Sequence, residues 1–348
     1  MVAAPTPHTG VAIRCDATTR SGVGHLVRQV ALAEELVGRG HGVRFVGDLE
    51  VPWARKQVSD RGFRLDAVPP GPLGAALAAS GVNAVVIDGY EIAADAGRTC
   101  RVSGLGVLTM VDGPFGLHQD ADVYVDQNLG AAAPPDARPG AEFLLGLDYV
   151  LLRDLVRERR DRAQRRLAPG EPPRVLVVFG GTDPYEGAPV LVPMLLDADV
   201  PVEVLAIAAR PEVAAHLDGL ERAAGQTVTV LPPTDDLPGV AASCDAVVSA
   251  SGTSVWEMLC LGLPLGLVCV TENQVLGYRE ATRELCLPVG QLGPLRADAA
   301  ARRAGVAELR RLLTDAGLRE RLAARGRALV DGRGRERVAD AVERLALR

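Results

Sequence analysis

Each half of this 348-residue chain opens with a short apolar run that leads into a glycine-containing turn. The first run is Val11–Cys15, ahead of the segment 22–24, and the second is Arg174–Phe179, ahead of Gly180-Gly181. After each run, strand-like segments alternate with amphipathic stretches that are typical of helices. Such alternation indicates parallel strands joined by crossover helices. We therefore expect an α/β protein with two Rossmann-like halves.

Runs of strand character recur through both halves. They are Val43–Gly47, Ala84–Asp88, Val107–Asp112, Val123–Asp126, Val202–Ala206, Val228–Leu231, Ala246–Ser249 and Leu265–Val270. Between the halves, an arginine-rich segment at 157–166 leads into a Pro/Gly cluster at 169–173, which is typical of an interdomain connection. We expect residues 1–160 to form an N-terminal domain and residues 174–325 to form a C-terminal domain.

Composition and charge argue against several classes of protein. The length suits two domains, and a hydrophobic content of 48% suits a globular chain with an ample core. The net charge of −6 argues against nucleic acid and against an anionic membrane surface as partners. The longest apolar stretch, 259–270, is short and is interrupted by Pro264, so we expect no membrane span.

The cysteines and the first residues of the chain indicate where it works. The six cysteines form no Cys-x-x-Cys pair and no cluster with histidine, so we expect no zinc site. They are typical of buried thiols in a cytosolic protein. Residues 1–10 lack the basic and apolar regions of a signal peptide. We therefore expect a cytoplasmic protein without a metal.

The turn after the first strand carries a histidine. Gly22 and Gly24 allow close approach of the backbone to a ligand, and His25 lies where the next helix should begin. A helix N-terminus attracts anions such as phosphate, and a histidine can transfer a proton near neutral pH. A purely structural turn with a capping polar residue explains the motif about as readily. Val27 occupies the third glycine position of the dinucleotide fingerprint, which disfavours NAD.

In the second half, a run of small polar residues follows the strand Ala246–Ser249. The hydroxyls of Ser251, Thr253 and Ser254 can donate to phosphate oxygens at a helix N-terminus. Glu257, one helical turn later, can accept hydrogen bonds from sugar hydroxyls. The alternative is a capping box in which a hydroxyl and the glutamate only close the helix end.

Uncharged amides follow the strand Leu265–Val270, in Glu272-Asn273-Gln274. Asn and Gln side chains both donate and accept hydrogen bonds, which suits a sugar or a phosphate. As an isolated segment, this is also an ordinary strand-to-helix loop. Ligands of open parallel sheets bind beyond the carboxyl ends of the strands, so we expect the site there in both halves.

Five motifs in order give the chain a family resemblance. They are Arg14-x-Asp16 with Gly22-x-Gly24-His25-x-x-Arg28, then 144–153, Phe179–Pro184, Ser251–Glu257 and Glu272–Gln274. Together they resemble the UDP-sugar hydrolases of the pseudaminic acid pathway and the related spore-coat polysaccharide proteins. These are similar in turn to the glycosyltransferase that adds N-acetylglucosamine in lipid II synthesis. The resemblance extends from about residue 11 to about residue 290.

The resemblance implies a GT-B architecture, with two Rossmann-like domains facing across a cleft that holds a UDP- or dTDP-sugar. It implies release of UDP from a deoxy-amino sugar by attack of water at the anomeric carbon, without a cofactor. By analogy, residues 326–348 would include a C-terminal helix that packs back on the first domain. The implied catalytic residues are His25, Asn273 and Tyr90. The implied substrate-binding residues are Asp16, Gly22, Gly24, Arg28, Gly180, Gly181, Thr182, Asp183, Ser251, Gly252, Thr253, Ser254, Glu257, Glu272 and Gln274.

The chain departs from the family in its first half. It has Asp88-Gly89-Tyr90 where the family commonly has Asp-His-Tyr, and Asp112-Gly113 where the family has paired aspartates. We expect a nucleotide-sugar hydrolase, and the alternative is a GT-B glycosyltransferase that uses an alcohol or amine in place of water. A third interpretation is a protein that binds a nucleotide-sugar without turnover, which the presence of His25 and Asn273 disfavours.

Overall fold

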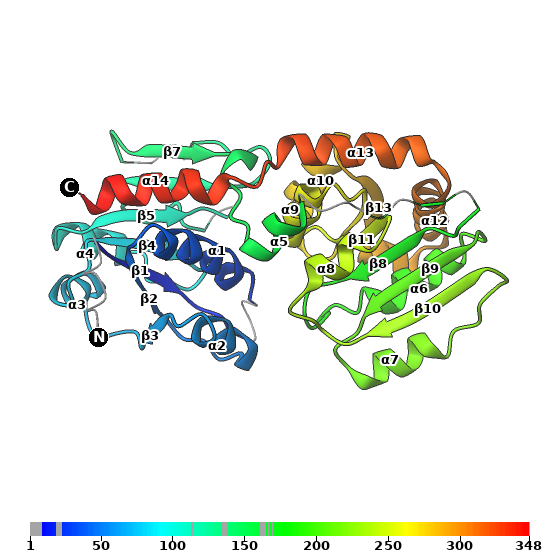
Figure 1. Cartoon of the computed structure of the whole chain (residues 1–348), viewed down its shortest axis with the longest axis horizontal. Coiled ribbons are helices and arrows are strands. Elements are labelled where there is room, and N and C mark those ends of the chain that lie inside the picture. The colour runs from blue at the N-terminus through cyan, green and yellow to red at the C-terminus, as the bar shows by residue number, and fades with distance from the viewer. Residues whose placement is uncertain are drawn as a thin grey trace. The chain divides into compact units, whose positions relative to one another are not determined.

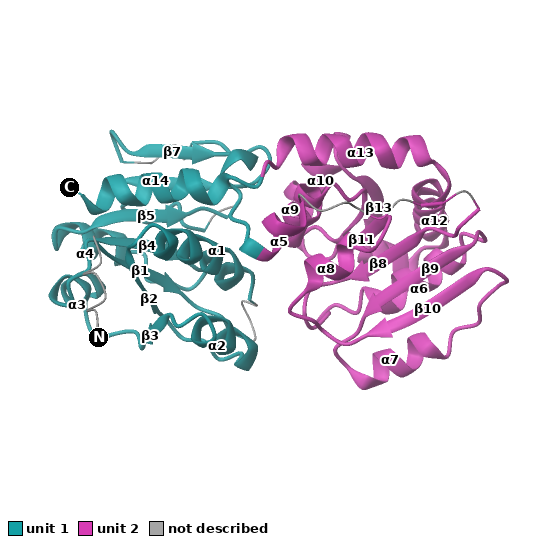
Figure 2. Cartoon of the chain, in the orientation of Figure 1, with its two compact units in different colours: residues 1–154, 332–348 teal, residues 155–331 magenta. Residues whose placement is uncertain are grey.

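The chain forms two compact units in a computed structural model. The structure describes residues 9–18, 23–112, 115–133, 138–160, 165, 167–168 and 170–347. Unit 1 consists of residues 1–154 and 332–348, and unit 2 of residues 155–331 (Figure 2). Unit 1 is therefore built from both ends of the chain.

Unit 1 contains a seven-stranded parallel sheet in the order β3-β2-β1-β4-β5-β6-β7 (Figure 1). Its central strands are almost wholly apolar because helices cover both faces of the sheet. The order reverses direction at β1 and β4, which places a binding crevice beyond the carboxyl ends of these two strands. The strands are β1 Gly10–Cys15, β2 Gly42–Val46, β3 Arg64–Asp66, β4 Ala84–Asp88, β5 Gly106–Met110, β6 Val123–Asp126 and β7 Glu142–Leu145.

Successive side chains of β4 and β5 pack alternately into two separate hydrophobic cores of unit 1. Val86 and Leu108 pack in one core with α1 and α14, whereas Val85 and Val107 pack in the other with α3 and α4. This period of two is the pattern of a strand buried on both faces. The helices are α1 Gly24–Gly38, α2 Pro52–Ser59, α3 Leu73–Ala79, α4 Ala96–Val102, the 3₁₀ turn η1 Leu147–Tyr149 and α14 Gly334–Ala346.

Unit 2 repeats the design with a six-stranded parallel sheet in the order β10-β9-β8-β11-β12-β13. The strands are β8 Arg174–Val178, β9 Val202–Ile207, β10 Gln226–Leu231, β11 Ala246–Ala250, β12 Leu265–Cys269 and β13 Leu287–Gln291. The helices are α6 Ala188–Leu196, α7 Pro211–Asp218, α8 Leu237–Ala242, α9 Ser254–Leu261, α10 Val275–Glu284, α11 Leu292–Ala297, α12 Ala299–Thr314 and α13 Ala316–Leu329, with a 3₁₀ turn η2 Glu272–Gln274. Among the described residues, no helix is long and apolar enough to cross a membrane.

The chain passes from unit 1 to unit 2 within α5, Asp154–Arg160, and returns just after α13. Arg160 binds the segment through which the chain returns to unit 1. Its guanidinium donates to the carbonyls of Arg327 and Val330 at 2.8 and 2.7 Å. It also donates to the carbonyl of Cys260 at the end of α9. These bonds satisfy carbonyls that a helix end leaves without partners.

Helix α14 then packs beside α1 on one face of the unit 1 sheet (Figure 1). Two glycines permit the close approach. A Cβ at Gly334 would lie 2.3 Å from the carbonyl oxygen of Val150, and one at Gly106 would lie 2.7 Å from the Cβ of Leu345. Val338 and Val342 are buried against the same core as α1.

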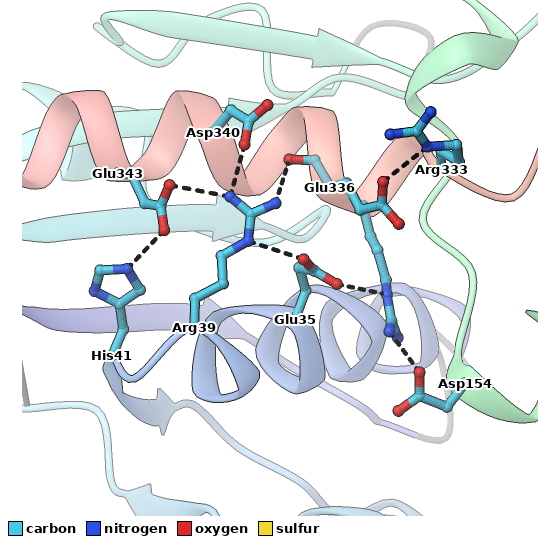
Figure 3. A network of polar contacts seen from close by, with 9 residues as sticks. Glu35, Arg39, His41, Asp154, Arg333, Glu336, Asp340 and Glu343 are labelled. Atoms are coloured by element: carbon cyan, nitrogen blue, oxygen red, sulfur yellow. Dashed lines mark hydrogen bonds and ion pairs between the residues drawn. The ribbon is translucent and has the colours of Figure 1, made fainter.

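A network of arginines and carboxylates joins α14 to α1 (Figure 3). Arg39 at the end of α1 pairs with Glu35, Asp340 and Glu343. Arg335 at the start of α14 is 5% exposed and pairs with Glu34, Glu35 and Asp154 at 3.3, 3.1 and 2.5 Å. Glu35 has a second arginine partner in Arg39, and Glu34 has one in Arg61. Removal of the buried Arg335 would still increase the excess of negative charge in this network.

We predict that Arg335→Ala destabilises unit 1 by about 2–3 kcal/mol, because breaking a buried ion pair costs far more than breaking an exposed one. The control is Arg344→Ala, which removes a half-exposed arginine paired with Glu142 and should cost less than about 1 kcal/mol. Urea unfolding would be followed by the fluorescence of Trp53 in a Trp256→Phe background. An equal loss of unfolding free energy in the two variants would contradict the prediction.

Candidate functional site

In unit 1, polar side chains gather at the carboxyl ends of β4, β5 and β6. Asp88 is the last residue of β4, and Asp112 and Asp126 follow or end the next two strands. His25 is the second residue of α1, and α1 begins beside these strand ends. The structure thus brings His25, Arg28 and Tyr90, three of the predicted site residues, into one cluster.

Asp88 is the centre of this cluster. Its carboxylate is 1% exposed and accepts hydrogen bonds from Arg28 Nε and Nη2 at 2.6 and 2.5 Å. It also accepts from Gln29 Nε2 at 2.8 Å, and its Oδ1 lies 2.8 Å from His25 Nδ1. The fork of Arg28 fits a carboxylate with two parallel bonds, which is a strong and specific geometry.

These contacts determine the tautomer of His25. A lone pair on Nδ1 would repel the carboxylate oxygen 2.8 Å away, so Nδ1 carries hydrogen and donates to Asp88. Arg28 Nη2 lies 3.0 Å from the same nitrogen, but Nδ1 then has no lone pair to accept a second hydrogen bond. Nε2 makes no hydrogen bond within the described ranges of the chain. In the neutral ring, the basic nitrogen is therefore Nε2.

Charge balance keeps Asp88 ionised. Burial alone would raise its pKa, but the Arg28 guanidinium and the His25 ring, by charge and by hydrogen bonds, hold the pKa well below its usual value. The pKa of Arg28 is raised, because the attraction of Asp88 outweighs the burial that opposes it. Asp88 and Arg28 thus remain an ion pair at neutral pH, in contact with Nδ1 of the imidazole.

Tyr90 and Asp112 border the same histidine. The Tyr90 ring meets His25 edge to face with 4.3 Å between centroids, and its hydroxyl donates to Asp112 Oδ2 at 3.1 Å. Burial and the nearby Asp112 carboxylate raise the pKa of the Tyr90 phenol well above its usual value, so it remains a hydrogen-bond donor at neutral pH. Asp112 is 31% exposed and lies 3.8 Å from Arg28 Nη1. Burial also raises the pKa of Asp126, two strands from Asp88.

Two further predicted residues of unit 1 have other surroundings. Asp16 accepts hydrogen bonds from Arg14 Nη1 at 2.5 Å and from the backbone N–H of Asp48 at 2.8 Å, so its carboxylate ties the end of β1 to the end of β2. Gly24 is the first residue of α1. Gly22 lies outside the described residues.

In unit 2, the predicted motifs follow three neighbouring strands, β8, β11 and β12. In the loop after β8, Gly180 has a φ of 72°, and Gly181 and Thr182 are exposed. Asp183 is 5% exposed, and its carboxylate accepts from the N–H groups of Gly187 and Ala188 at 2.7 and 2.9 Å. Asp183 therefore closes the N-terminus of α6, while the three residues before it face solvent.

The turn after β11 is not a capping box. Thr253 is the N-cap of α9, and its side chain makes no capping hydrogen bond. Ser251 and Gly252 are partly exposed ahead of it, and Ser254 is the first helical residue. The side chain of Thr253 is thus not used up by a local cap, whereas the N–H groups of Val255 and Trp256 donate to the carbonyls of Gly252 and Thr253 at 3.1 and 3.2 Å. The turn therefore offers hydroxyls at a helix N-terminus, where an anion is favoured. Glu257 is buried within the first turn of α9.

The segment after β12 forms the 3₁₀ turn η2. Gln274 Oε1 accepts from the backbone N–H of Val270 at 3.1 Å, so this amide holds the turn against the strand. Asn273 is exposed, and its Oδ1 accepts from the Thr271 hydroxyl at 2.6 Å, which leaves its NH₂ group toward solvent. Glu272 is exposed as well.

Sequence reasoning missed three residues of the His25 cluster as site residues, which are Asp88, Gln29 and Asp112. Asp88 ends a buried strand and precedes glycine, a position that could have marked it, since an acid at that edge of the sheet faces the helix after β1. Gln29 is fully buried and bonded to Asp88, yet one glutamine in an amphipathic helix carries no signal of its own.

Comparison with protein-family models and with curated protein sequences found no match. Solved structures do match almost the whole chain. MurG of Acinetobacter baumannii superposes with a TM-score of 0.65 and 17% identity, covering 97% of this chain and 99% of that one. A putative UDP-N-acetylglucosamine 2-epimerase of Listeria monocytogenes superposes with a TM-score of 0.65 and 14% identity, covering 96% of this chain and 95% of that one. The glycosyltransferase of kitacinnamycin superposes with a TM-score of 0.65 and 15% identity, covering 98% of this chain and 100% of that one.

These likenesses, with the two parallel sheets, show that the chain has the GT-B fold. The expected fold class, two Rossmann-like domains of α/β type, is confirmed. At such identities the likeness concerns the fold alone.

We predict that Asp88 makes the stability of unit 1 depend on pH in the acid range. Its folded pKa lies below its ordinary value of 3.8, so the unfolded chain takes up the proton first as the pH falls. The stabilisation is therefore complete at neutral pH and is lost from about pH 4 downward.

Asp88→Asn should lower the stability at neutral pH by about 3–5 kcal/mol, because it leaves Arg28 buried without its counter-charge, and should flatten this acid dependence. Urea unfolding at several pH values measures both effects. The control is Asp48→Asn, at an exposed position. An acid slope that is the same in wild type and Asp88→Asn would contradict the assignment.

Proposed function

We propose that this protein transfers a sugar from a UDP- or dTDP-sugar to an alcohol or amine acceptor. The observation that carries the proposal is the His25–Asp88 pair, in which a buried carboxylate orients the ring and leaves Nε2 as the base. The pair lies where ligands of open parallel sheets bind, beyond the carboxyl ends of the strands.

In this proposal, unit 1 activates the acceptor. Nε2 of His25 takes the proton of the acceptor hydroxyl while the acceptor oxygen forms a bond to the anomeric carbon of the sugar. Asp88 fixes the ring and balances the charge that the imidazole gains. Arg28 and Gln29 are positioning residues, because both donate to Asp88 Oδ2 and Arg28 also donates to Oδ1, the oxygen that His25 contacts. The Tyr90 hydroxyl is held by Asp112 and borders the same space.

Unit 2 holds the nucleotide in this proposal. The bond from the anomeric carbon to the diphosphate breaks as the acceptor bond forms, and negative charge gathers on the departing phosphate. The N-terminus of α9, which the Thr253 side chain does not cap, and the hydroxyls of Ser251, Thr253 and Ser254 suit that charge. Glu257 would bind ribose hydroxyls, and Asn273 would donate from its NH₂ group to the sugar or the phosphate. The exposed residues 180–182 would add backbone N–H groups.

Hydrolysis is the second candidate, favoured by the motifs shared with the UDP-sugar hydrolases. Water can occupy the place of the acceptor, and His25 would then take a proton from it by the same geometry. The likeness to glycosyltransferase structures supports transfer over hydrolysis. The two differ in one measurable respect, which is whether release of the nucleotide diphosphate requires an acceptor.

We predict that the purified chain releases UDP or dTDP from at least one member of a panel of nucleotide-sugars, and does so faster with alcohol and amine acceptors than without them. His25→Ala should lower the rate at least about a hundredfold, the usual contribution of a general base. His216→Ala, at an exposed position on α7, is the matched control and should leave the rate unchanged.

Each outcome of this assay has a definite meaning. Release that is as fast without an acceptor as with one would establish hydrolysis in place of transfer. Binding of nucleotide-sugars without any release, unaltered by His25→Ala, would favour a binding protein. Neither binding nor release across the panel would overturn the proposed function.

We also predict that Thr253→Val weakens UDP binding by about tenfold or more, since a hydrogen bond to a charged group is lost. Its hydroxyl does not cap α9, so the fold should be unaffected. Thr282→Val is the control, because that hydroxyl bonds within its own helix α10, to the carbonyls of Tyr278 and Arg279. Isothermal titration with UDP measures the affinities, and His25→Ala should bind UDP as tightly as wild type.

A further inference from the structure

One amino group of the Arg28 guanidinium is not used in holding Asp88. Nε and Nη2 both donate to the Asp88 carboxylate. Because a guanidinium is planar, a carboxylate bound along its Nε–Nη2 edge leaves both hydrogens of Nη1 directed elsewhere. Nη1 makes no hydrogen bond within the described ranges of the chain. An arginine that is only 3% exposed thus keeps two N–H donors for another partner.

Asp112 lies on this unused side of the guanidinium, with Oδ2 3.8 Å from Nη1. That separation is longer than a hydrogen bond, which joins such atoms at about 2.7–3.2 Å. Asp112 is held where it is, because its backbone N–H and carbonyl both bond to Phe115 at 3.1 Å and the Tyr90 phenol donates to its carboxylate. The carboxylate is 31% exposed, so a solute can reach it. A donor and an acceptor therefore face one space without bonding to each other.

This space lies beside the proposed base. Nη2 of Arg28, which is joined to the same carbon atom as Nη1, is 3.0 Å from His25 Nδ1. On the other side, the Tyr90 ring contacts His25, and the Tyr90 hydroxyl contacts Asp112. The four side chains thus form a closed ring of contacts. A molecule bound between Arg28 and Asp112 is therefore in position to present another of its groups to His25.

The donors and charges of the two residues decide which chemical group fits between them. An ammonium group only donates, so it would pair with Asp112 but would be repelled by Nη1 of Arg28. A carboxylate or phosphate only accepts, so it would pair with Nη1 but would be repelled by Asp112. A neutral hydroxyl accepts from Nη1 and donates its own hydrogen to Asp112. The pair therefore suits a hydroxyl better than either charged group.

We propose that Arg28 Nη1 and Asp112 bind a second hydroxyl of the acceptor, beside the hydroxyl that reacts at His25. This narrows the acceptor from alcohols and amines in general to diols, a class that includes sugars. The assignment to the acceptor rests on the proposed function, whereas the preference of this subsite for a hydroxyl does not. Asp112 is then the residue that determines which acceptors are used.

The hydroxyl preference can be tested by NMR without any donor. The chain has five histidines, so ring-labelled protein gives few signals, and the His25 signal is the one that disappears in His25→Ala. The probes trans-1,2-cyclohexanediol, cyclohexanol and trans-2-aminocyclohexanol share one ring and differ at one group. We expect the diol to shift the His25 signal saturably and to bind at least about tenfold more tightly than the other two, since a hydrogen bond to a charged group is gained. The signal of His216, exposed on α7, should not move.

Asp112→Ala should lower the affinity for the diol to that for cyclohexanol and leave the affinity for cyclohexanol unchanged. Asp112→Asn, which keeps an acceptor oxygen, should retain part of the preference. The control is Asp95→Ala, which removes a 57% exposed carboxylate that makes no capping bond at α4 and should leave the preference intact. Thermal unfolding shows that each variant is folded. Equal affinities for the three probes in wild type, no response of the His25 signal, or an unaltered preference in folded Asp112→Ala would overturn the subsite.

Assays with an active donor separate the acceptor from the donor sugar as the source of the hydroxyl. Asp112→Ala should raise the KM for the diol at least about tenfold and leave the KM for the donor unchanged. A raised KM for the donor, with an unaltered KM for the diol, would assign the hydroxyl to the donor sugar and overturn the acceptor subsite. A His25 signal that responds to the diol, in a protein that neither binds UDP nor turns over any nucleotide-sugar, would sink the proposed function alone.

Discussion

The ion pair between Asp88 and Arg28 is the interaction on which the rest of unit 1 depends. It joins the end of β4 to the first turns of α1, and both residues are almost fully buried. Neither charge can remain there alone, because an isolated buried ion is strongly unfavourable. The pair also orients His25. One contact therefore stabilises the sheet against its helix and prepares the group that we propose to be the base.

Buried or half-buried arginines also bind the two segments at which the chain crosses between the units. Arg335 in unit 1 contacts Asp154, the last residue before the first passage, and Arg160 in unit 2 contacts Val330, just before the second. In each unit, a guanidinium thus joins the segment of the first crossing to the segment of the second. Guanidinium groups suit this work, because their several donors satisfy carboxylates and helix-end carbonyls at once.

The fold was predictable from the sequence wherever burial leaves a clear pattern. The apolar strands of both halves and the start of α1 at His25 were expected and are present, and because parallel strands end at one edge, their polar residues were expected to meet. The short edge strands β3, β7 and β13 were missed, since half-exposed strands lack a continuous apolar run. The contacts of Asp88 and Gln29 were missed because they join residues 59 to 63 positions apart. Asp183 caps α6 from a backbone with a φ of 44°, a conformation that residue spacing does not reveal.

The discontinuity of unit 1 has a consequence for synthesis on the ribosome. Helix α14 is translated after the whole of unit 2, so the apolar surface of α1 that Val338, Val342 and Leu345 cover lacks this partner until unit 2 has been translated. Unit 2 is continuous and can complete its core first. The nascent chain therefore carries an open hydrophobic face on α1 while unit 2 is translated, which makes that face a natural binding site for chaperones.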